Sequence, residues 1–322
     1  MTTDQPILQA IVLTMAQAIV LVSVSPSIVG LVNKVKARLQ CRQGAGILQP
    51  YADLKKLFRK QAVVSTSTSW IFTATPYIVF ASTVTAGLLV PVFASQTPLN
   101  FAGNIIALVY LLALGTFFLI LAGLDSGSPF GGMGSSREAI VASLTEPAMI
   151  MAIFAIALTA GSTNLSTIVH KTALLEGIVT DPSPHVMALA ALFIVALAET
   201  GRVPVDNPAT HLELTMIHEA MLLEYSGHYL ALLEWASAIK LLVFLTLIAN
   251  VFAPWGIATS LTPVALTIGL AVYLAKIAGL ALLIGTIECM FAKLRLFRVT
   301  DLLGVAFILA LLGLLFFYML RG

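Results

Sequence analysis

Residues 103–124 read GNIIALVYLLALGTFFLILAGL and contain no charged side chain. The hydrocarbon core of a bilayer needs about 20 apolar residues per helix, so this stretch is long enough to cross a membrane. Further runs of the same character lie at 6–32, 71–94, 138–160, 185–200, 233–253, 262–287 and 302–320. The sequence therefore predicts an all-α integral membrane protein with about eight transmembrane helices in a single polytopic domain, 1–322.

The composition supports a membrane protein. Of the 322 residues, 59% are hydrophobic and only 10% are charged, whereas a soluble domain carries about 25% charged residues. Cys41 and Cys289 stand alone without a CxxC pair, which argues against a disulfide framework, an iron–sulfur cluster or a zinc site. The N-terminus MTTDQPILQA lacks the basic flank of a secretory signal, so we expect the first apolar run to be retained as a helix.

The lysines and arginines are distributed asymmetrically. Of these 17 residues, 13 lie in the connectors 33–61, 125–137, 200–232 and 288–301, which fall on one side when the helices alternate in direction. Positively charged loops stay in the cytoplasm, so these connectors are predicted to be cytoplasmic and both termini to lie outside. Because loops carry function more often than the helices that position them, we expect docking or chemistry on this face.

Two of these connectors have recognisable patterns. In GILQPYADLKKLFRKQ (46–61), apolar residues recur at helical spacing and basic residues occupy the other faces. This pattern predicts an amphipathic helix that lies on anionic head groups, docks a soluble partner, or does both. Nucleic acid is not expected, because no aromatic residues are arranged for base stacking. The glycine-rich segment 127–138 lacks the ending of a phosphate-binding loop and is interpreted as a flexible turn.

Several glutamates fall within or at the edge of predicted helices. Glu146 lies in the middle of one and directly precedes Pro147, which opens a helix locally and admits water. A charge at the bilayer centre costs at least roughly 2.5 kcal/mol, so it faces a wet cavity or a partner. We favour a proton-relay role for Glu146; the alternative is a structural pair with Lys240 or Lys276. Three others are expected near the head groups, where the cost is low: Glu199, Glu234 and Glu288.

The connector AETGRVPVDNPATHLELTMIHEAMLLEYSG (198–227) is acidic where its neighbours are basic. Glu213 and Glu224 are eleven residues apart, about three helical turns, which places both carboxylates on one helix face. Thr210 and Glu213 also have the spacing of a capping box, so Glu213 has a structural alternative. Asp206 and Arg202 lie nearby. Charge pairing between loops and a proton-entry cluster both account for this pattern.

Three cytoplasmic segments carry a family pattern in a fixed order. Its residues are Gly44, Gly46, Leu48, Gln49, Pro50, Ala52, Asp53, Lys56 and Leu57; then Gly123, Gly134, Arg137 and Glu146; then Glu199, Thr200, Arg202, Pro204, Asp206, Glu213, Leu214, Glu224, Tyr225 and Ser226. Together they resemble the family of membrane subunits that line the quinone chamber of complex I, the NADH-quinone oxidoreductase. The resemblance covers most of the chain, from about residue 38 to 303.

The departures from complex I point to one branch of that family. The acidic loop has Ala209 and His211 where complex I has glutamates, and the first loop is shortened to Gly44-Ala45-Gly46. The string GLDSGSPF, followed by SRE and EP, resembles the membrane subunit of group-four [NiFe]-hydrogenases and formate hydrogenlyase, of the subunit 4 type. We prefer this branch. A quinone-binding subunit of complex I is the alternative, and a free-standing secondary transporter is an alternative of another class.

The resemblance implies a membrane-anchoring and ion-coupling subunit of an oxidoreductase complex in the bacterial inner membrane, with no catalytic residue, metal ligand or redox centre of its own. Nickel–iron and iron–sulfur centres would belong to partner subunits, and a quinone is a candidate ligand. The implied partners are hydrogenase-like large and small subunits, an iron–sulfur subunit, antiporter-like membrane subunits and membrane lipid.

The implied site has three groups of residues. The proton relay comprises Glu146, Glu199, Glu213, Glu224 and Asp206. The charge partners are Arg137, Arg202, Lys240 and Lys276. Docking of the arm, or lining of a quinone chamber, falls to Arg42, Gly44, Gly46, Gln49, Pro50, Asp53 and Lys56.

Overall fold

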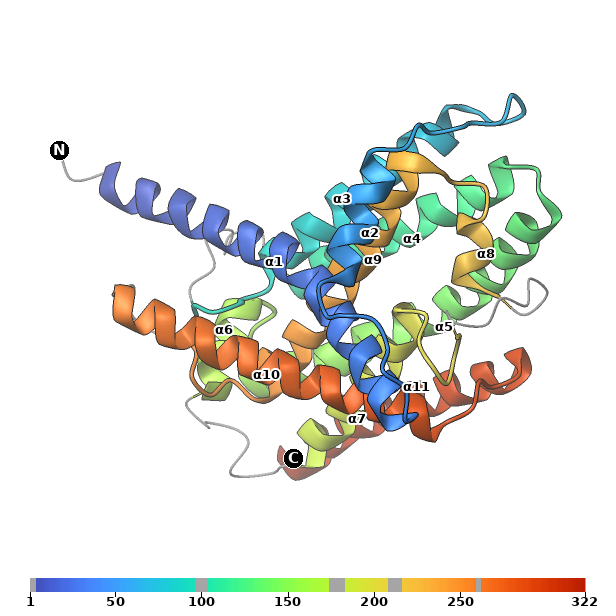
Figure 1. Ribbon diagram of the computed structural model, residues 1–322. Helices are drawn as coiled ribbons and strands as arrows, with labels where there is room; N and C mark the ends of the chain where they lie inside the picture. Colours follow the sequence, from blue (N-terminus) through green and yellow to red (C-terminus); the bar gives the residue numbers. More distant parts are fainter. Residues whose placement is uncertain (1–3, 96–102, 174–182, 208–215, 259–261, 322) are drawn as a thin grey trace.

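The computed structural model describes residues 4–95, 103–173, 183–207, 216–258 and 262–321, and every named element in these ranges is a helix (Figure 1). The helices are α1 (Asp4–Leu39), α2 (Gln49–Phe58), α3 (Trp70–Leu89), α4 (Ile105–Asp125), α5 (Pro129–Ala160), α6 (Leu165–Ala173), α7 (Ser183–Glu199), α8 (His218–Leu222), α9 (Gly227–Leu247), the π-helix η2 (Ile248–Phe252), α10 (Pro263–Met290) and α11 (Leu296–Arg321).

In the described ranges, 7 helices are long and apolar enough to cross a membrane: α1, α3, α4, α5, α9 with η2, α10 and α11. The apolar helix α7 has 17 residues and coincides with 185–200, which is the shortest of the predicted runs. The predicted all-α, multi-pass architecture is therefore confirmed. The short helix α6 (Leu165–Ala173) lies in a segment for which the sequence predicts only a connector.

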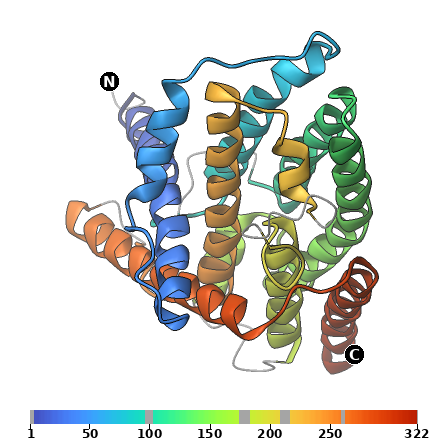
Figure 2. The same cartoon turned by 45° about the vertical axis from the view of Figure 1, so that its right-hand side comes forward.

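Helix α9 runs through the middle of the bundle (Figure 2). It contacts α1, α2 and α3, and the residues of its second half are almost all buried. Helices α3, α4 and α5 pack in succession on one side, α11 packs against α5 and α7, and α10 packs along α1. Helix α9 contacts α1 and α10 on one side and α3 on the other. A side chain on α9 can therefore point toward the α1–α10 pair or toward the α3–α5 group.

The amphipathic segment forms the predicted helix, with bounds Gln49–Phe58. Its apolar face is held in three places. Leu54 is buried, the Tyr51 hydroxyl donates to the Ser23 carbonyl of α1, and the Phe58 ring meets Trp235 of α9 edge-on at 6.0 Å. Its lysines remain exposed. These contacts fix α2 against the end of the bundle where α9 begins.

The interpretation of 127–138 as a flexible turn is wrong, because α5 already begins at Pro129. Ser128 caps this helix by accepting a hydrogen bond from the Gly131 amide at 3.2 Å, and proline in the first turn favours helix initiation. The glycines serve packing instead. A Cβ on Gly134 would lie 2.9 Å from the Ile217 carbonyl oxygen and 2.8 Å from the Ala220 Cβ, so only glycine lets α8 approach.

This close approach predicts that alanine substitution has opposite effects on stability at Gly134 and Gly132, which lie within one helical turn. Gly134→Ala forces α5 and α8 apart, and we expect it to destabilise the protein by about 1–3 kcal/mol. Gly132→Ala meets nothing within 4 Å and should stabilise by about 0.5–1 kcal/mol through helix propensity. Thermal unfolding of the two purified variants in detergent measures the difference, and equal midpoints would contradict the packing role of Gly134.

Candidate functional site

A cavity of about 390 Å³ lies between α1, α2, α8, α9, α10 and the chain that follows α7. Hereafter it is called the chamber. Its polar and charged lining residues are Asn33, Lys36, Asp53, Thr200, Arg202, Asp206, His218, Glu219, Glu234, Ser237 and Glu288. These residues come from segments far apart in the sequence, and two of the predicted cytoplasmic connectors, 33–61 and 200–232, contribute most of them.

One wall of the chamber is fixed by a buried ion triad. The Glu288 carboxylate, at the end of α10, lies 2.7 Å from Lys36 of α1 and 2.6 Å from Arg202. Its side chain is fully buried, so its charge is balanced by these two cations rather than by water. Removing one partner from such a group leaves an uncompensated buried charge, which costs about 3–5 kcal/mol. The triad therefore ties α1, α10 and the connector after α7 together.

Asp206 organises the connector that leads to α8. One carboxylate oxygen lies 2.6 Å from Lys293, and the other accepts from the backbone amides of Ile217 and His218 at 3.1 and 3.3 Å. Arg137 of α5 donates to the Met216 carbonyl at 2.9 Å and holds the same strand of chain from the opposite side. Charge pairing between the acidic and basic loops, one of the two explanations offered for their composition, is thus confirmed.

Among the carboxylates that line the chamber, Glu219 has a pKa near neutral pH. Burial, together with the nearby charges of Glu234 and Asp206, raises the pKa of Glu219 to about 7. Burial and the charge of Lys240 lower the pKa of the adjacent His218 to about 4, against the opposing charges of Asp206 and Glu199. At neutral pH His218 is therefore neutral, while Glu219 is poised to take up or release a proton.

A second cavity, of about 30 Å³, lies deeper between α3, α4, α5 and α9. A site of about 10–15 Å³ already holds one water, so this cavity is large enough for water. It shares Thr200, His218, Leu222 and Ser237 with the chamber, and these residues are hereafter called the junction. Beyond the junction the cavity is lined by Glu138, Glu199 and Lys240. Polar groups thus continue from the chamber into the bundle.

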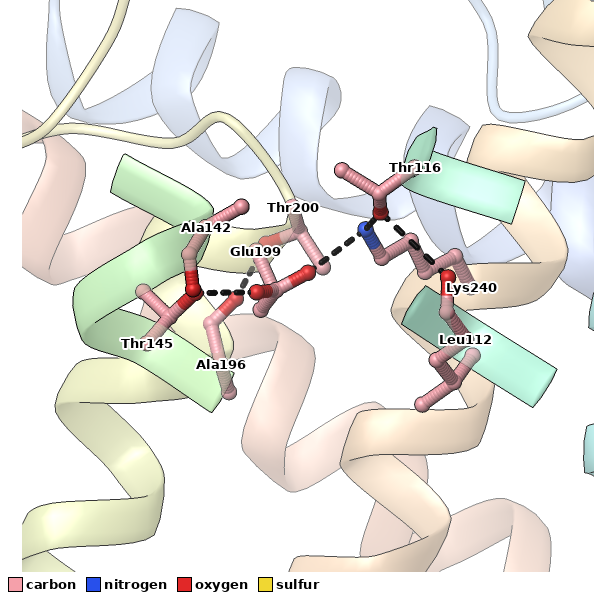
Figure 3. Close-up of polar contacts among 8 residues, drawn as sticks. All are labelled: Leu112, Thr116, Ala142, Thr145, Ala196, Glu199, Thr200 and Lys240. Carbon is pink, nitrogen blue, oxygen red and sulfur yellow. Dashed lines mark hydrogen bonds and ion pairs between the residues drawn. The ribbon is translucent and has the colours of Figure 1, made fainter. Parts of the chain in front are cut away.

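Glu199 and Lys240 form an ion pair in the interior (Figure 3). The Lys240 ammonium of α9 lies 2.7 Å from one Glu199 oxygen and 3.2 Å from the Thr116 hydroxyl of α4. The Thr145 hydroxyl of α5 donates to the other Glu199 oxygen. Only 9% of Glu199 is exposed, so its carboxylate depends on these partners rather than on water. Glu199 ends α7, and its charge is buried in protein there.

The structural alternative for Glu146 is not found. Glu146 lies in the middle of α5, half-buried, and makes no ion pair with any described residue. Lys240 is engaged with Glu199, and Lys276 donates to the Ala253 carbonyl at 2.5 Å. Glu146 directly follows Thr145 and interacts electrostatically with the Glu199–Lys240 pair. Among the carboxylates of α5, Glu146 is therefore the one adjacent in sequence to a hydrogen-bond partner of the buried pair.

The predicted helix that presents Glu213 and Glu224 on one face is wrong. Helix α8 covers only His218–Leu222, and Glu224 follows its end with an exposed side chain. Asp206 competes with a longer helix, because it accepts the amides of Ile217 and His218 and fixes the helix start. Glu213 lies outside the described residues.

Of the predicted docking or chamber-lining residues in the first loop, Pro50 and Asp53 line the chamber. Gln49 supports Asp53 through a hydrogen bond of 3.1 Å. The others are exposed on the surface beside it: Arg42, Gly44, Gly46 and Lys56. Gly44 adopts a left-handed conformation with φ of 60°, which explains the need for glycine there.

Sequence reasoning missed several residues that the fold brings to the site. In the sequence, Glu138 is only the last residue of the string SRE, and Lys36 is only one of several basic residues in connector 33–61. The signal that could have found Glu138 is its helical spacing from Ala142 and Thr145, which puts a carboxylate on the buried face of α5. His218 lies in the acidic connector without a motif around it, and its position at the junction follows from tertiary packing.

Comparisons with known proteins agree on one family. A family model described as NADH dehydrogenase matches residues 11–319. The chain is 35% identical over 306 residues to Hydrogenase-4 component C of Escherichia coli K12, covering 95% of each chain. It is 36% identical over 283 residues to formate hydrogenlyase subunit 4 of the same organism, covering 87% of this chain and 90% of that one.

More distant similarities extend to complex I and to an archaeal assembly. The corresponding NADH-quinone oxidoreductase subunit of Rhodospirillum rubrum is 32% identical over 207 residues, which cover 62% of this chain and 60% of that protein. A chain from the structure of the membrane-bound sulfane sulfur reductase, an archaeal respiratory membrane complex, superposes with a TM-score of 0.82 at 22% identity, covering 95% of this chain and 99% of that chain. The latter similarity concerns the fold.

The raised pKa of Glu219 predicts how stability depends on pH. The folded chain holds this proton up to a pH of about 7, whereas the group ordinarily releases it near 4.5. Glu219 therefore costs stability as pH rises between these values. Glu219→Gln removes this loss, and we expect a gain of up to about 3 kcal/mol at roughly pH 7.5 that vanishes below about pH 4.5.

Thermal unfolding of wild type and Glu219→Gln across this pH range tests the expectation. His218 titrates in both proteins, so its contribution cancels in the difference. Glu224→Gln, which removes an exposed carboxylate from the same connector, is the matched control and should follow wild type. A pH-independent difference between Glu219→Gln and wild type would contradict the assignment.

Proposed function

We infer the function from one premise: the chain belongs to the NADH dehydrogenase family. It is homologous to the membrane subunits of hydrogenase-4 and formate hydrogenlyase and to their counterpart in complex I. We propose that it is the membrane-anchoring and ion-coupling subunit of a hydrogenase-type or formate hydrogenlyase-like complex. In this role it docks a soluble electron-transfer arm and links that arm to proton or sodium translocation.

The observation that carries this proposal is the pair of cavities that meet at the junction. The chamber lies where α2 and the acidic connector come together, which is the face that a soluble arm would cover. The inner cavity leads from the junction to Glu199 and Lys240 between the membrane helices. Only the small inner cavity, which is large enough for water, separates the chamber from the buried ion pair of Glu199 and Lys240.

In this proposal, the role of each side chain follows from its contacts. The triad of Lys36, Arg202 and Glu288 keeps the chamber open. Glu219 accepts or releases a proton when the electrostatic environment of the chamber changes, because its pKa lies near neutral pH. Each change in its charge alters the field at the junction, which low-dielectric surroundings screen weakly.

The interior pair then responds to that field. A new charge near the junction shifts the balance between the ion pair of Glu199 and Lys240 and the hydration that the inner cavity has room for. Glu146 directly follows Thr145, which hydrogen-bonds to Glu199, and makes no ion pair among the described residues. It is therefore the candidate acceptor for a proton that leaves the inner cavity. Glu213, which is outside the described residues, and the exposed Glu224 are not needed for this sequence of steps.

The partners and the location follow from the same premise. Exposed basic residues on and just after α2 (Lys55, Lys56, Arg59 and Lys60) offer a positively charged docking face. We propose that hydrogenase-like large and small subunits and an iron–sulfur subunit bind there, with nickel–iron and iron–sulfur centres in those partners. Antiporter-like subunits would lie alongside in a bacterial inner membrane, with the chamber facing the cytoplasm.

A quinone-binding subunit of complex I is the second candidate. The chamber favours it, since about 390 Å³ lies within the range of roughly 300–1,000 Å³ of small-molecule sites. The lining fits less well, because ion pairs and carboxylates dominate it where a quinone ring needs apolar contact. Inhibition of the intact complex by quinone analogues, without hydrogen evolution, would favour this candidate.

Glu199→Gln tests the coupling role. It leaves the docking face intact but leaves Lys240 without its carboxylate. We expect ion translocation by the intact complex in sealed vesicles to fall by at least about 10-fold, since a positioned proton-transfer group contributes roughly 10²–10⁴-fold. Hydrogen evolution by the arm should persist.

Asp301→Asn, which removes an exposed carboxylate from α11, is the control and should translocate as wild type does. Undiminished translocation by Glu199→Gln at normal hydrogen evolution would contradict the coupling role. Ion transport by the purified chain alone in liposomes would instead indicate a free-standing transporter.

A further inference from the structure

A third cavity, of about 670 Å³, lies away from the chamber between α7, η2 and α10. Its lining is apolar with one exception, and includes Leu189, Phe193, Phe252 and Leu280. The exception is Lys276, the only charged side chain among the described residues that line it. Val186 and Leu283, at its margins, are 61% and 46% exposed, so the cavity opens sideways toward the surface that faces the membrane.

The ammonium group of Lys276 has hydrogen-bond donors available for an anion. It lies in the middle of α10, half-buried, and donates to the Ala253 carbonyl at 2.5 Å. An ammonium group has three donors, and within the described ranges Lys276 makes no ion pair. A lysine at the centre of a membrane helix costs about 2.5–3.5 kcal/mol, and pairing with an anion offsets that cost.

The ammonium group of Lys276 reaches the end of the helix bundle opposite the chamber. Glu234 and Ser237, in the first half of α9, line the chamber, whereas Ala253 follows η2 at the other end of the same helix. The turn after Ala253 packs on α10, since a Cβ on Gly256 would lie 2.6 Å from Val272, one helical turn before Lys276. Lys276 therefore reaches toward a surface turn, as snorkelling lysines do.

Trp255 in this turn lines the cavity and is 69% exposed. Tryptophan side chains concentrate at the level of the lipid head groups, so the cation and the indole lie together at the polar end of the cavity. The remaining lining extends into the hydrocarbon region along α7 and α10 and offers only apolar contact. A molecule that fits has one anionic end and a long apolar body.

We propose that this cavity binds an anionic phospholipid from the leaflet opposite the chamber, with its phosphate on Lys276 and an acyl chain between α7 and α10. The lipid supplies the counter-charge that the described part of the protein does not provide there. It also fills the space beside the π-helix η2, whose five residues connect α9 to the turn that carries Trp255. Charge complementarity and the lateral opening favour a lipid over a soluble anion.

Native mass spectrometry of the full-length chain in mild detergent, with dioleoyl-phosphatidylglycerol added, measures the binding. Lys276→Gln should weaken retention of this lipid by about 10-fold or more, as expected for a lost charge-assisted contact. Lys276→Arg should retain it. Gly279→Leu should also weaken it, because a Cβ at Gly279 meets nothing within 4 Å and the new side chain fills the cavity without a clash.

Lys171→Gln is the matched control, since Lys171 also donates to a backbone carbonyl, that of Ala160 at 2.7 Å, but does not line this cavity. It should bind as wild type does. Equal retention by wild type, Lys276→Gln and Gly279→Leu would overturn the proposal, as would equal affinity for the zwitterionic dioleoyl-phosphatidylcholine. So would photo-crosslinking from position 186 in the intact complex that captures a partner subunit in place of lipid.

Discussion

Glu199 carries its charge in the interior of the helix bundle, and the arrangement of the interior depends on how that charge is balanced. Lys240 reaches it from α9 and Thr145 from α5, so three helices must meet at one point. A buried carboxylate with one partner removed costs about 3–5 kcal/mol, which is a large share of the stability of a typical domain. The central position of α9 follows, because only a central helix can supply a cation to this side of the bundle while lining the chamber on the other.

The same constraint acts twice more around the chamber. Glu288 requires Lys36 and Arg202, and Asp206 requires Lys293 and two backbone amides. Each requirement joins an acidic side chain from one connector to a basic side chain from another. Paired charges thus fix the segments that line the chamber. Glu219, which also lines the chamber, has no ion pair among the described residues and is left to titrate.

The sequence predicts the features that the membrane itself imposes. Long apolar runs specify the spans because every backbone polar group in lipid must be satisfied within a helix. Contacts between distant segments leave no such signal. The pairing of Lys240 with Glu199 rather than with Glu146 depends on helix rotation, which no run of apolar residues encodes. The early start of α5 was missed because its glycines suggest a turn, whereas they are required for contact with α8. Asp206 accepts hydrogen bonds from the amides of Ile217 and His218. These bonds favour a short helix that begins at His218 over the longer helix predicted to contain Glu213 and Glu224.

The central claim is that the chamber communicates with the Glu199–Lys240 pair through the junction. Ser237 lines both cavities, and Ser237→Val fills the passage without touching either ion pair. The direct measurement is the number of ions translocated per hydrogen evolved by the intact complex in sealed vesicles, with Ser143→Val on the exposed face of α5 as control. The account predicts that this ratio falls sharply in Ser237→Val while hydrogen evolution continues and the control is unchanged. An unchanged ratio in Ser237→Val would contradict it.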